Sequence, residues 1–294
     1  MQIPNHKSEI PNPKSQIRNP KSEIPNPKSQ IPNPKSQIIN PKSEILNLPA
    51  SAAAHHARMQ RRDIDTRARP RYTVGRMLEN ILYIVAGYLI GAIPFGYLAG
   101  RVNGIDLREH GSHNIGATNA IRVLGKKWGI PVFLLDFLKG YVPLLLMKLY
   151  LGGDATQFGV AEMGWFMAMM LALVLGHTYT CYLGFKGGKG VATTAGCVMA
   201  LSPSLCGIAL GVWVLMMALT RYVSLSSMVA AVAMVLLGMY EFWWADGVLG
   251  VPDMMLIGLL LLICILVIVK HRSNIVRLIH GTEPKAFSQK SPQD

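Results

Sequence analysis

A series of apolar segments, each about as long as a membrane-spanning helix, constrains this chain more than any other feature. The hydrocarbon core of a bilayer is about 30 Å thick, and an α-helix needs about 20 mostly apolar residues to cross it. Seven segments come close to this length. They are 80–100, 128–151, 160–177, 190–203, 204–219, 224–244 and 253–270. The sequence therefore predicts an all-α, polytopic membrane protein with seven transmembrane helices.

The distribution of basic residues predicts how these helices are oriented. Lys and Arg gather in the connections 101–127 and 178–189, in the turn at Arg221 and in the tail that starts at Lys270. Because cytoplasmic loops carry an excess of Lys and Arg, these four regions should share the cytoplasmic face. They share one face only with seven helices and an external N-terminus. The alternative is that 190–219 forms one long kinked span, which would give six helices.

The N-terminal segment has a different character. Residues 3–51 repeat with a period of seven, as in the unit IPNPKSQ, and most units contain proline. Proline inside a helix costs ~3 kcal/mol, so this period predicts a disordered tract and no coiled coil. We expect that residues 1–76, repeats and basic stretch together, are not part of the native protein and that translation starts at Met77. The alternative is a genuine basic tail that binds anionic lipid.

The remaining domain predictions follow from this division. Residues 77–285 form the seven-helix membrane domain, and 286–294 form a short cytoplasmic tail. The chain carries a net charge of +13, but most of the excess lies in residues 1–76. The high charge therefore does not indicate a nucleic-acid partner. The four cysteines lack CxxC spacing, so neither a metal site nor a disulfide framework is predicted.

The first cytoplasmic loop has the composition of a ligand-binding loop. It reads GSHNIGATNAIRVLGKKWG over residues 111–129. Glycine lets the backbone approach a ligand closely, Asn and Ser supply neutral donors, and Arg122 supplies a bidentate cation that matches phosphate. The alternative is an ordinary solvated turn, since loops commonly carry such residues.

The second loop, GHTYTCYLGFKGGKGVATT over 176–194, places glycines around Lys189 just before a predicted helix. Such a position can bind an anion through free N–H groups and the helix dipole. A Walker A motif would need glycine at Leu183 and Ser or Thr at Gly190, so ATP binding is not predicted. The alternative is a flexible basic loop.

Two further polar clusters belong to the same face. The first is TRYVSLSS (220–227), whose alternative interpretation is an interfacial anchor with a helix cap. The second is HRSNIVRLIHGTEPK (271–285), where His271 and Asn274 would share one face of a helix, with Arg277 three residues further along.

The polar groups therefore concentrate at one interface. A transporter would place them near the middle of the bilayer, where only Asp136 and Lys139 carry charge and can pair with each other. This pattern favours an enzyme that acts on one lipid-soluble and one phosphate-bearing substrate.

Together, the motifs resemble those of a known family. GSxNIGATNxxR, GHxxxxxLxFKGGKGVAT, TRYVSLxS and HRxNIxRLxxGTE occur in this order, with LLDFLKG at 134–140. This combination is similar to the bacterial acyl-phosphate-dependent glycerol-3-phosphate acyltransferases (the PlsY type), over about residues 77–285. His113 departs from the pattern, because family members commonly have glycine there. The H-x4-D motif of other glycerol acyltransferases is absent.

The resemblance implies an activity. The chain would transfer a fatty acyl group from acyl phosphate to the sn-1 hydroxyl of glycerol-3-phosphate, giving lysophosphatidic acid and phosphate in the first step of phospholipid synthesis. It would need no cofactor or metal, and it would lie in the bacterial inner membrane with its active site facing the cytoplasm. A functional link to an acyl-phosphate-producing acyltransferase is also implied.

The resemblance also implies roles for individual residues. Ser112 and His271 would lie at the reacting centre as catalytic residues. The substrate- and phosphate-binding residues would be Asn119, Arg122, Lys186, Gly187, Gly188, Lys189, Ser224 and Asn274. Two other classes stay open: a membrane transporter of an organic phosphate, and a non-enzymatic scaffold that binds anionic lipid.

Overall fold

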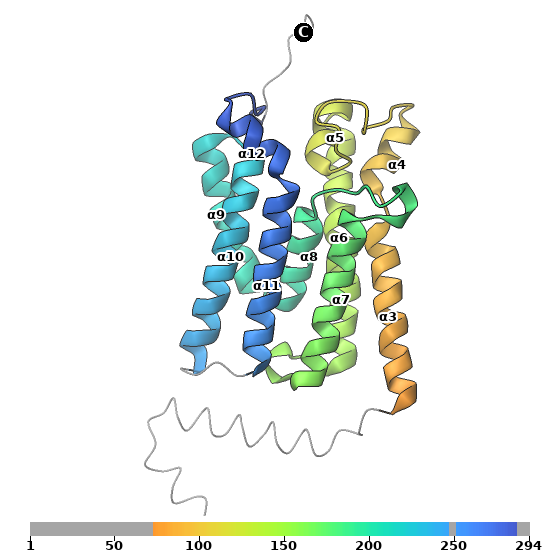
Figure 1. Ribbon diagram of the computed structural model, residues 1–294, viewed down its shortest axis with the longest axis vertical. Coiled ribbons are helices and arrows are strands. Elements are labelled where there is room, and N and C mark those ends of the chain that lie inside the picture. The colour runs from red at the N-terminus through yellow and green to blue at the C-terminus, as the bar shows by residue number, and fades with distance from the viewer. Residues whose placement is uncertain (1–72, 247–250, 287–294) are drawn as a thin grey trace, which may run out of the picture. The chain divides into compact units, whose positions relative to one another are not determined.

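The computed structural model describes residues 73–246 and 251–286, and these residues contain helices and no strand. The predicted repeat tail and nearly all of the predicted C-terminal tail lie outside the described residues. The helices are α3 Val74–Ala92, α4 Phe95–Val102, α5 Ala117–Leu124, α6 Lys126–Leu151, α7 Val160–Thr178, α8 Val191–Leu201, α9 Pro203–Thr220, α10 Val223–Asp246, α11 Val251–Lys270 and α12 Arg272–Ile279, with short 3-10 helices η4 Ala155–Gln157 and η5 Cys181–Leu183 (Figure 1).

The predicted membrane architecture is confirmed. Among the described residues, six helical segments are long and apolar enough to cross a bilayer, and α8 is a seventh, shorter apolar helix. The division at Ser202-Pro203 is also confirmed, because Ser202 caps α9: its Oγ accepts a hydrogen bond from Leu205 N at 3.2 Å. Proline is favoured in the first turn of a helix, which fits Pro203 there. Helices α8 and α9 are therefore separate.

The first predicted span, 80–100, differs in detail from the structure. The helical segment begins at Val74, three residues before Met77, and is broken between α3 and α4 at Ile93-Pro94. Proline has no N–H to donate, so carbonyl groups near it lose their helical partners. Side chains from other helices replace them: Lys139 Nζ donates to Ile93 O at 2.7 Å, and Thr180 Oγ1 donates to Ala92 O at 2.5 Å.

The connection 101–127 is also more regular than its sequence predicts. Its second half forms α5, an eight-residue helix that packs against α6. The glycines and asparagines of 111–129 favour turns, so the sequence predicts a loop there. The helix forms because ATNAIRVL has a strongly amphipathic pattern, which buries Ala120 against Leu107 and Val132.

The short helix α8 is held inside the protein by α6. Gly140 and Gly196 let the two backbones approach so closely that a Cβ at either position would overlap with the other helix. At the end of α8, Lys148 Nζ donates to the carbonyl oxygens of Ala200 (3.0 Å) and Leu201 (3.2 Å). A cation at a helix C-terminus satisfies these carbonyls and the helix dipole, so α8 can end at 11 residues.

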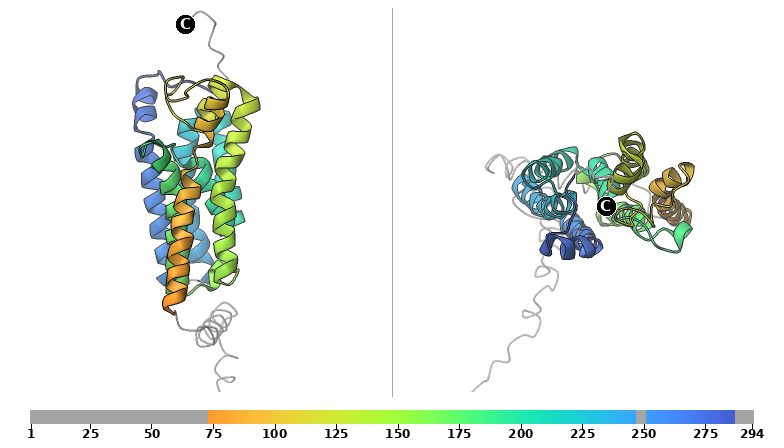
Figure 2. Two further views of the ribbon diagram at one scale, coloured as in Figure 1. Left: turned by 90° about the vertical axis from the view of Figure 1, so that its right-hand side faces the viewer. Right: turned by 90° about the horizontal axis from the view of Figure 1, so that it is seen from above.

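The core consists of apolar side chains from α6 to α11, such as Leu144, Phe166, Met170, Leu260 and Ile263. Many large apolar side chains on the outside are exposed, as expected of surfaces that face lipid. Seen from above, α4 and α5 lie on one side and α9, α10 and α12 on the other (Figure 2). The polar segments that connect the helices at this end come from both sides.

Candidate active site

The loop before α5 is built around one buried side chain, that of Asn119. Its Nδ2 donates to the carbonyl oxygens of Leu107 (3.1 Å), His110 (3.0 Å) and Asn114 (2.8 Å). Its Oδ1 accepts a hydrogen bond from Ser112 N at 2.8 Å. The amide of Asn119 is therefore occupied by the loop itself. The structure gives this residue the role of organising the loop and presenting Ser112, and leaves its amide little capacity for a substrate.

The glycine-rich loop 184–190 also differs from the expected anion-binding arrangement. Gly187 N donates to Thr178 O at 3.2 Å, and Gly188 N donates to His177 O at 3.0 Å. Both amides are thus bound to the C-terminal carbonyls of α7 and are not free for a phosphate. These two hydrogen bonds attach the loop to the end of α7. Lys189, which follows Gly188, is half-buried, whereas Lys186 is exposed to solvent.

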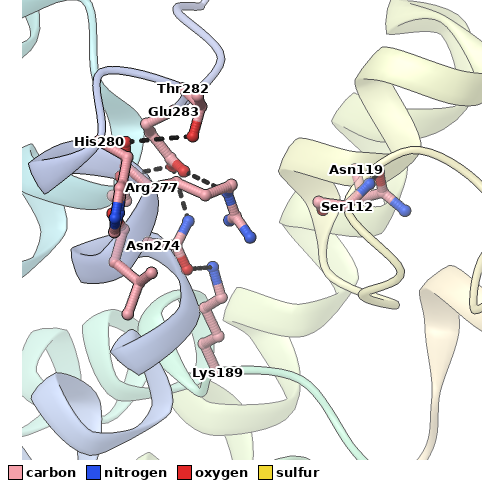
Figure 3. A network of polar contacts seen from close by, with 10 residues as sticks. Ser112, Asn119, Lys189, Asn274, Arg277, His280, Thr282 and Glu283 are labelled. Atoms are coloured by element: carbon pink, nitrogen blue, oxygen red, sulfur yellow. Dashed lines mark hydrogen bonds and ion pairs between the residues drawn. The ribbon is translucent and has the colours of Figure 1, made fainter.

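Lys189 enters a network that joins three distant parts of the chain (Figure 3). Its Nζ donates to Asn274 Oδ1 at 2.7 Å, and Asn274 Nδ2 donates to Glu283 Oε1 at 2.6 Å. The same carboxylate accepts from Ser224 Oγ at 2.7 Å and from Arg277 Nε at 2.8 Å. Glu283 is therefore the common acceptor for groups from α10 and α12.

The chain reaches this arrangement by turning back after α12. Gly281 has a positive φ of 70°, which lets the backbone reverse without strain. Thr282 N and Glu283 N both donate to Arg277 O, at 2.8 Å and 3.1 Å. These bonds satisfy a carbonyl at the end of the helix and bring the Glu283 carboxylate next to Arg277.

The electrostatics of the network favour anions. Burial lowers the pKa of Lys189 to about 8, with Glu283 opposing this shift and Arg277 and Arg122 adding to it. Arg122 is exposed, but partial desolvation of its guanidinium lowers its pKa, and its charge interacts with those of Glu283 and Arg277. Burial opposes ionisation of Glu283, but hydrogen bonds from Asn274, Ser224 and Arg277 lower its pKa. Three cationic groups therefore surround one carboxylate and leave an excess of positive charge.

His271 lies at the junction of α11 and α12 and is buried, with only 2% of its surface exposed. Its Nδ1 lies 2.8 Å from Val267 O, so Nδ1 carries the proton and Nε2 is left as an acceptor. Burial lowers the pKa of His271 to about 4, and the positive charge of Lys189 adds to this shift. His271 is therefore neutral near pH 7.

The structure brings together some of the predicted site residues and separates others. Lys189, Asn274 and Ser224 meet in one network, and Arg122 lies within the range of its charges. Ser112 and Asn119 lie across from this network in Figure 3 and belong to the loop before α5. The catalytic roles expected of Ser112 and His271 stay predictions.

Two residues of the network, Glu283 and Arg277, were absent from the predicted set. The sequence did contain a signal for Glu283, because it ends the GTE motif of the fourth cluster. Its role was missed because its partners, Ser224 and Arg277, meet it only through the turn at Gly281.

Comparisons with known proteins point to one family. The family model for glycerol-3-phosphate acyltransferase matches residues 81–281. A glycerol-3-phosphate acyltransferase of Geobacter sulfurreducens is 44% identical over 207 residues, which cover 70% of this chain and 97% of the relative. One from Acholeplasma laidlawii is 39% identical over 224 residues, covering 73% and 96%.

Solved structures lead to the same result. The crystal structure of PlsY, an integral membrane glycerol 3-phosphate acyltransferase, in its glycerol 3-phosphate form has a TM-score of 0.61 and 39% identity, covering 70% of this chain and 95% of that one. Its lysophosphatidic acid form has a TM-score of 0.59 and 38% identity, with the same coverage. The chain is thus an acyltransferase of the membrane, and it belongs to the glycerol-3-phosphate acyltransferase family.

Proposed function

We propose that this chain transfers a fatty acyl group from acyl phosphate to the sn-1 hydroxyl of glycerol-3-phosphate, which yields lysophosphatidic acid and phosphate. This would be the first step of phospholipid synthesis. The observation that carries the proposal is the cluster of Lys189, Arg277 and Arg122 around the single carboxylate of Glu283, at one end of a set of apolar helices. Such a site suits phosphate groups of molecules that partition between water and membrane.

The forms in which the related PlsY structures were solved support the acceptor and the product. One of these structures is the glycerol 3-phosphate form, and the other is the lysophosphatidic acid form. The donor rests on chemistry. An acyl phosphate is a mixed anhydride and is already activated, so the protein needs only to place the hydroxyl against the carbonyl carbon and to stabilise developing charge.

The proposed step forms one bond and breaks one. The sn-1 oxygen attacks the acyl carbon, the bond from that carbon to the phosphate oxygen breaks, and phosphate leaves with the electron pair. Nε2 of His271 accepts a hydrogen bond from the hydroxyl and orients it, together with Ser112. A histidine with a pKa of about 4 is a weak base, so the proton leaves on the phosphate, which binds protons near pH 6.

We further propose that the site faces the cytoplasm from the bacterial inner membrane. The connections at the end of the helices that carries α4, α5 and α12 contain the basic clusters, as positive-inside orientation requires (Figure 1). Acyl phosphate would come from a separate acyltransferase that produces it. No cofactor is part of the proposed reaction.

The test is an assay of donor choice with the purified full chain in detergent or vesicles. Labelled glycerol-3-phosphate is offered with palmitoyl phosphate and, in parallel, with palmitoyl-CoA. The proposal expects labelled lysophosphatidic acid with the acyl phosphate alone. Product from palmitoyl-CoA alone would overturn the proposed donor, and uptake of label into vesicles without product would favour transport.

A further inference from the structure

A buried polar cluster lies directly beneath the glycine-rich loop, and the proposed reaction does not use it. It consists of Asp136 and Lys139 on α6 and His177 near the end of α7, which are 2%, 5% and 6% exposed. Lys139 Nζ lies 2.8 Å from Asp136 Oδ1, which confirms the pairing expected from the sequence. His177 Nδ1 lies 3.5 Å from the same oxygen. Charged groups inside a membrane protein are costly, so a paired cluster suggests a specific role.

The cluster fixes the position of the His177 ring. Lys139 is itself held by the carbonyl of Ile93 at 2.7 Å, and Asp136 O accepts a hydrogen bond from Thr193 Oγ1 at 3.0 Å. Three parts of the chain thus meet at one point, namely the break between α3 and α4, helix α6, and helix α8. His177 faces this point with Nδ1, which lies 3.5 Å from Asp136 Oδ1, and its Nε2 lies on the side of Gly188.

Gly188 rests on that other side of the ring. A Cβ built on Gly188 would overlap with His177 Nε2, so the loop backbone lies against the imidazole with no room for a side chain. The backbone amides of Gly187 and Gly188 are bound to Thr178 O and His177 O, which fixes the loop from a second direction. The next residue is Lys189, whose Nζ reaches Asn274 at 2.7 Å.

We propose that His177 is a positioning residue: its ring, oriented by Asp136, supports Gly188 and thereby sets the position of Lys189 in the phosphate site. This proposal rests on the proposed function, because it assigns Lys189 to phosphate binding. The Asp136–Lys139 pair alone would satisfy both charges, whereas the ring of His177 is the part of the cluster that contacts the loop.

The first test substitutes the two residues in contact, Gly188 and His177, singly and together. Gly188→Ala should lower kcat/KM for glycerol-3-phosphate about 100-fold, because its methyl group must displace the ring. His177→Ala should raise KM about tenfold, and His177→Gln, which keeps a planar polar side chain, should restore most of the loss. The double variant should regain about tenfold over Gly188→Ala, because the removed ring makes room for the methyl group.

The proposal would be overturned if the loss of kcat/KM in the double variant equalled the product of the losses in the two single variants. Gly207→Ala is a matched control, since a Cβ there meets nothing within 4 Å, and it should leave kinetics unchanged. Melting temperatures in detergent identify variants that lose the fold instead of the contact.

A second measurement needs no substrate and so separates this proposal from the proposed function. Hydrogen exchange of the peptide that spans 184–190 reports on the amides of Gly187 and Gly188. His177→Ala should speed their exchange about tenfold or more, while the peptide from α5 keeps its rate. Unchanged exchange in 184–190 would show that His177 does not support the loop. Failure of the unmodified chain to make product would instead contradict the proposed function alone.

Discussion

The two sides of the site are polar in different ways. On the side of α5, the amide of Asn119 bonds four backbone groups of one loop, and no charge is involved. On the side of α12, the Glu283 carboxylate collects side chains from separate helices and is surrounded by cations. The first arrangement shapes a local loop, and the second joins distant elements and leaves positive charge over. Arg122 on α5 adds its charge to the second arrangement, so the positive charge that we propose binds phosphate gathers around Glu283.

The largest expected effect comes from removing the shared carboxylate. Glu283→Ala would leave Ser224, Asn274 and Arg277 without their acceptor, and breaking such a partly buried network costs about 3 kcal/mol in the free energy of unfolding. We expect lower stability and lost activity together. Thermal unfolding in detergent measures the first. Glu283→Gln, which keeps an acceptor oxygen, should lose less; an equal loss would show that the charge alone matters.

Lys189 tests the charged side by function. Lys189→Gln removes one cation and one charged hydrogen bond, worth about 1.5–3 kcal/mol, so kcat/KM should fall about 10- to 100-fold. Lys127→Gln, an exposed lysine at the start of α6, is the control and should stay within about twofold. Lys186→Gln should lose less than Lys189→Gln because Lys186 is exposed. A larger loss at Lys186 would restore the equal roles that the sequence suggested.

Asn119 tests the neutral side by stability. Asn119→Ala would leave buried backbone groups of the loop unpaired, at a cost of about 1–3 kcal/mol. We expect a lower melting temperature and a fall in kcat, because Ser112 loses its support. Thr118→Ala, next to it and exposed, should change neither quantity. A change in KM alone would indicate that Asn119 contacts substrate directly.

The pH dependence should separate the two sides once more. Lys189 has a pKa of about 8, so it is charged below that pH and neutral above it. Phosphate binding should therefore weaken as pH rises through about 8, and KM for glycerol-3-phosphate should rise up to about tenfold. In Lys189→Arg the cation persists at high pH, so KM should no longer rise above a pH of about 8. If KM rose at the same pH in both proteins, the pH dependence would come from a group other than Lys189.

The smallest effect is expected at His113, the position that departs from the motif pattern in the sequence. His113 has a positive φ of 57°, which glycine adopts without strain, and its Nδ1 lies 3.0 Å from Arg108 O. His113→Gly relieves about 1 kcal/mol of strain and removes one exposed hydrogen bond, so the melting temperature should shift by no more than about 3 °C. A large loss of activity would give His113 a role in the site.

What the sequence could predict followed from local properties. Apolar length predicted the spans, Ser202-Pro203 predicted the division between α8 and α9, and the spacing of Asp136 and Lys139 predicted their pair. These features depend on residues close together in the chain, so composition and period reveal them.

What the sequence could not predict depended on partners far along the chain. The carbonyls freed at Pro94 are satisfied by Lys139 and Thr180, and the amides of the glycine-rich loop are taken up by the end of α7. Glu283 reaches Ser224, 59 residues before it, only after the turn that follows α12. None of these contacts leaves a periodic signal, so the motifs alone predict phosphate binding by the glycines and no role for Glu283.

The most direct test of the central claim is the stoichiometry of the products. The purified full chain is given glycerol-3-phosphate and palmitoyl phosphate, and both lysophosphatidic acid and released inorganic phosphate are measured over time. The account predicts that the two appear in equal amounts and that both fall together in Lys189→Gln. Release of phosphate without lysophosphatidic acid, or no release from a folded sample, would contradict it.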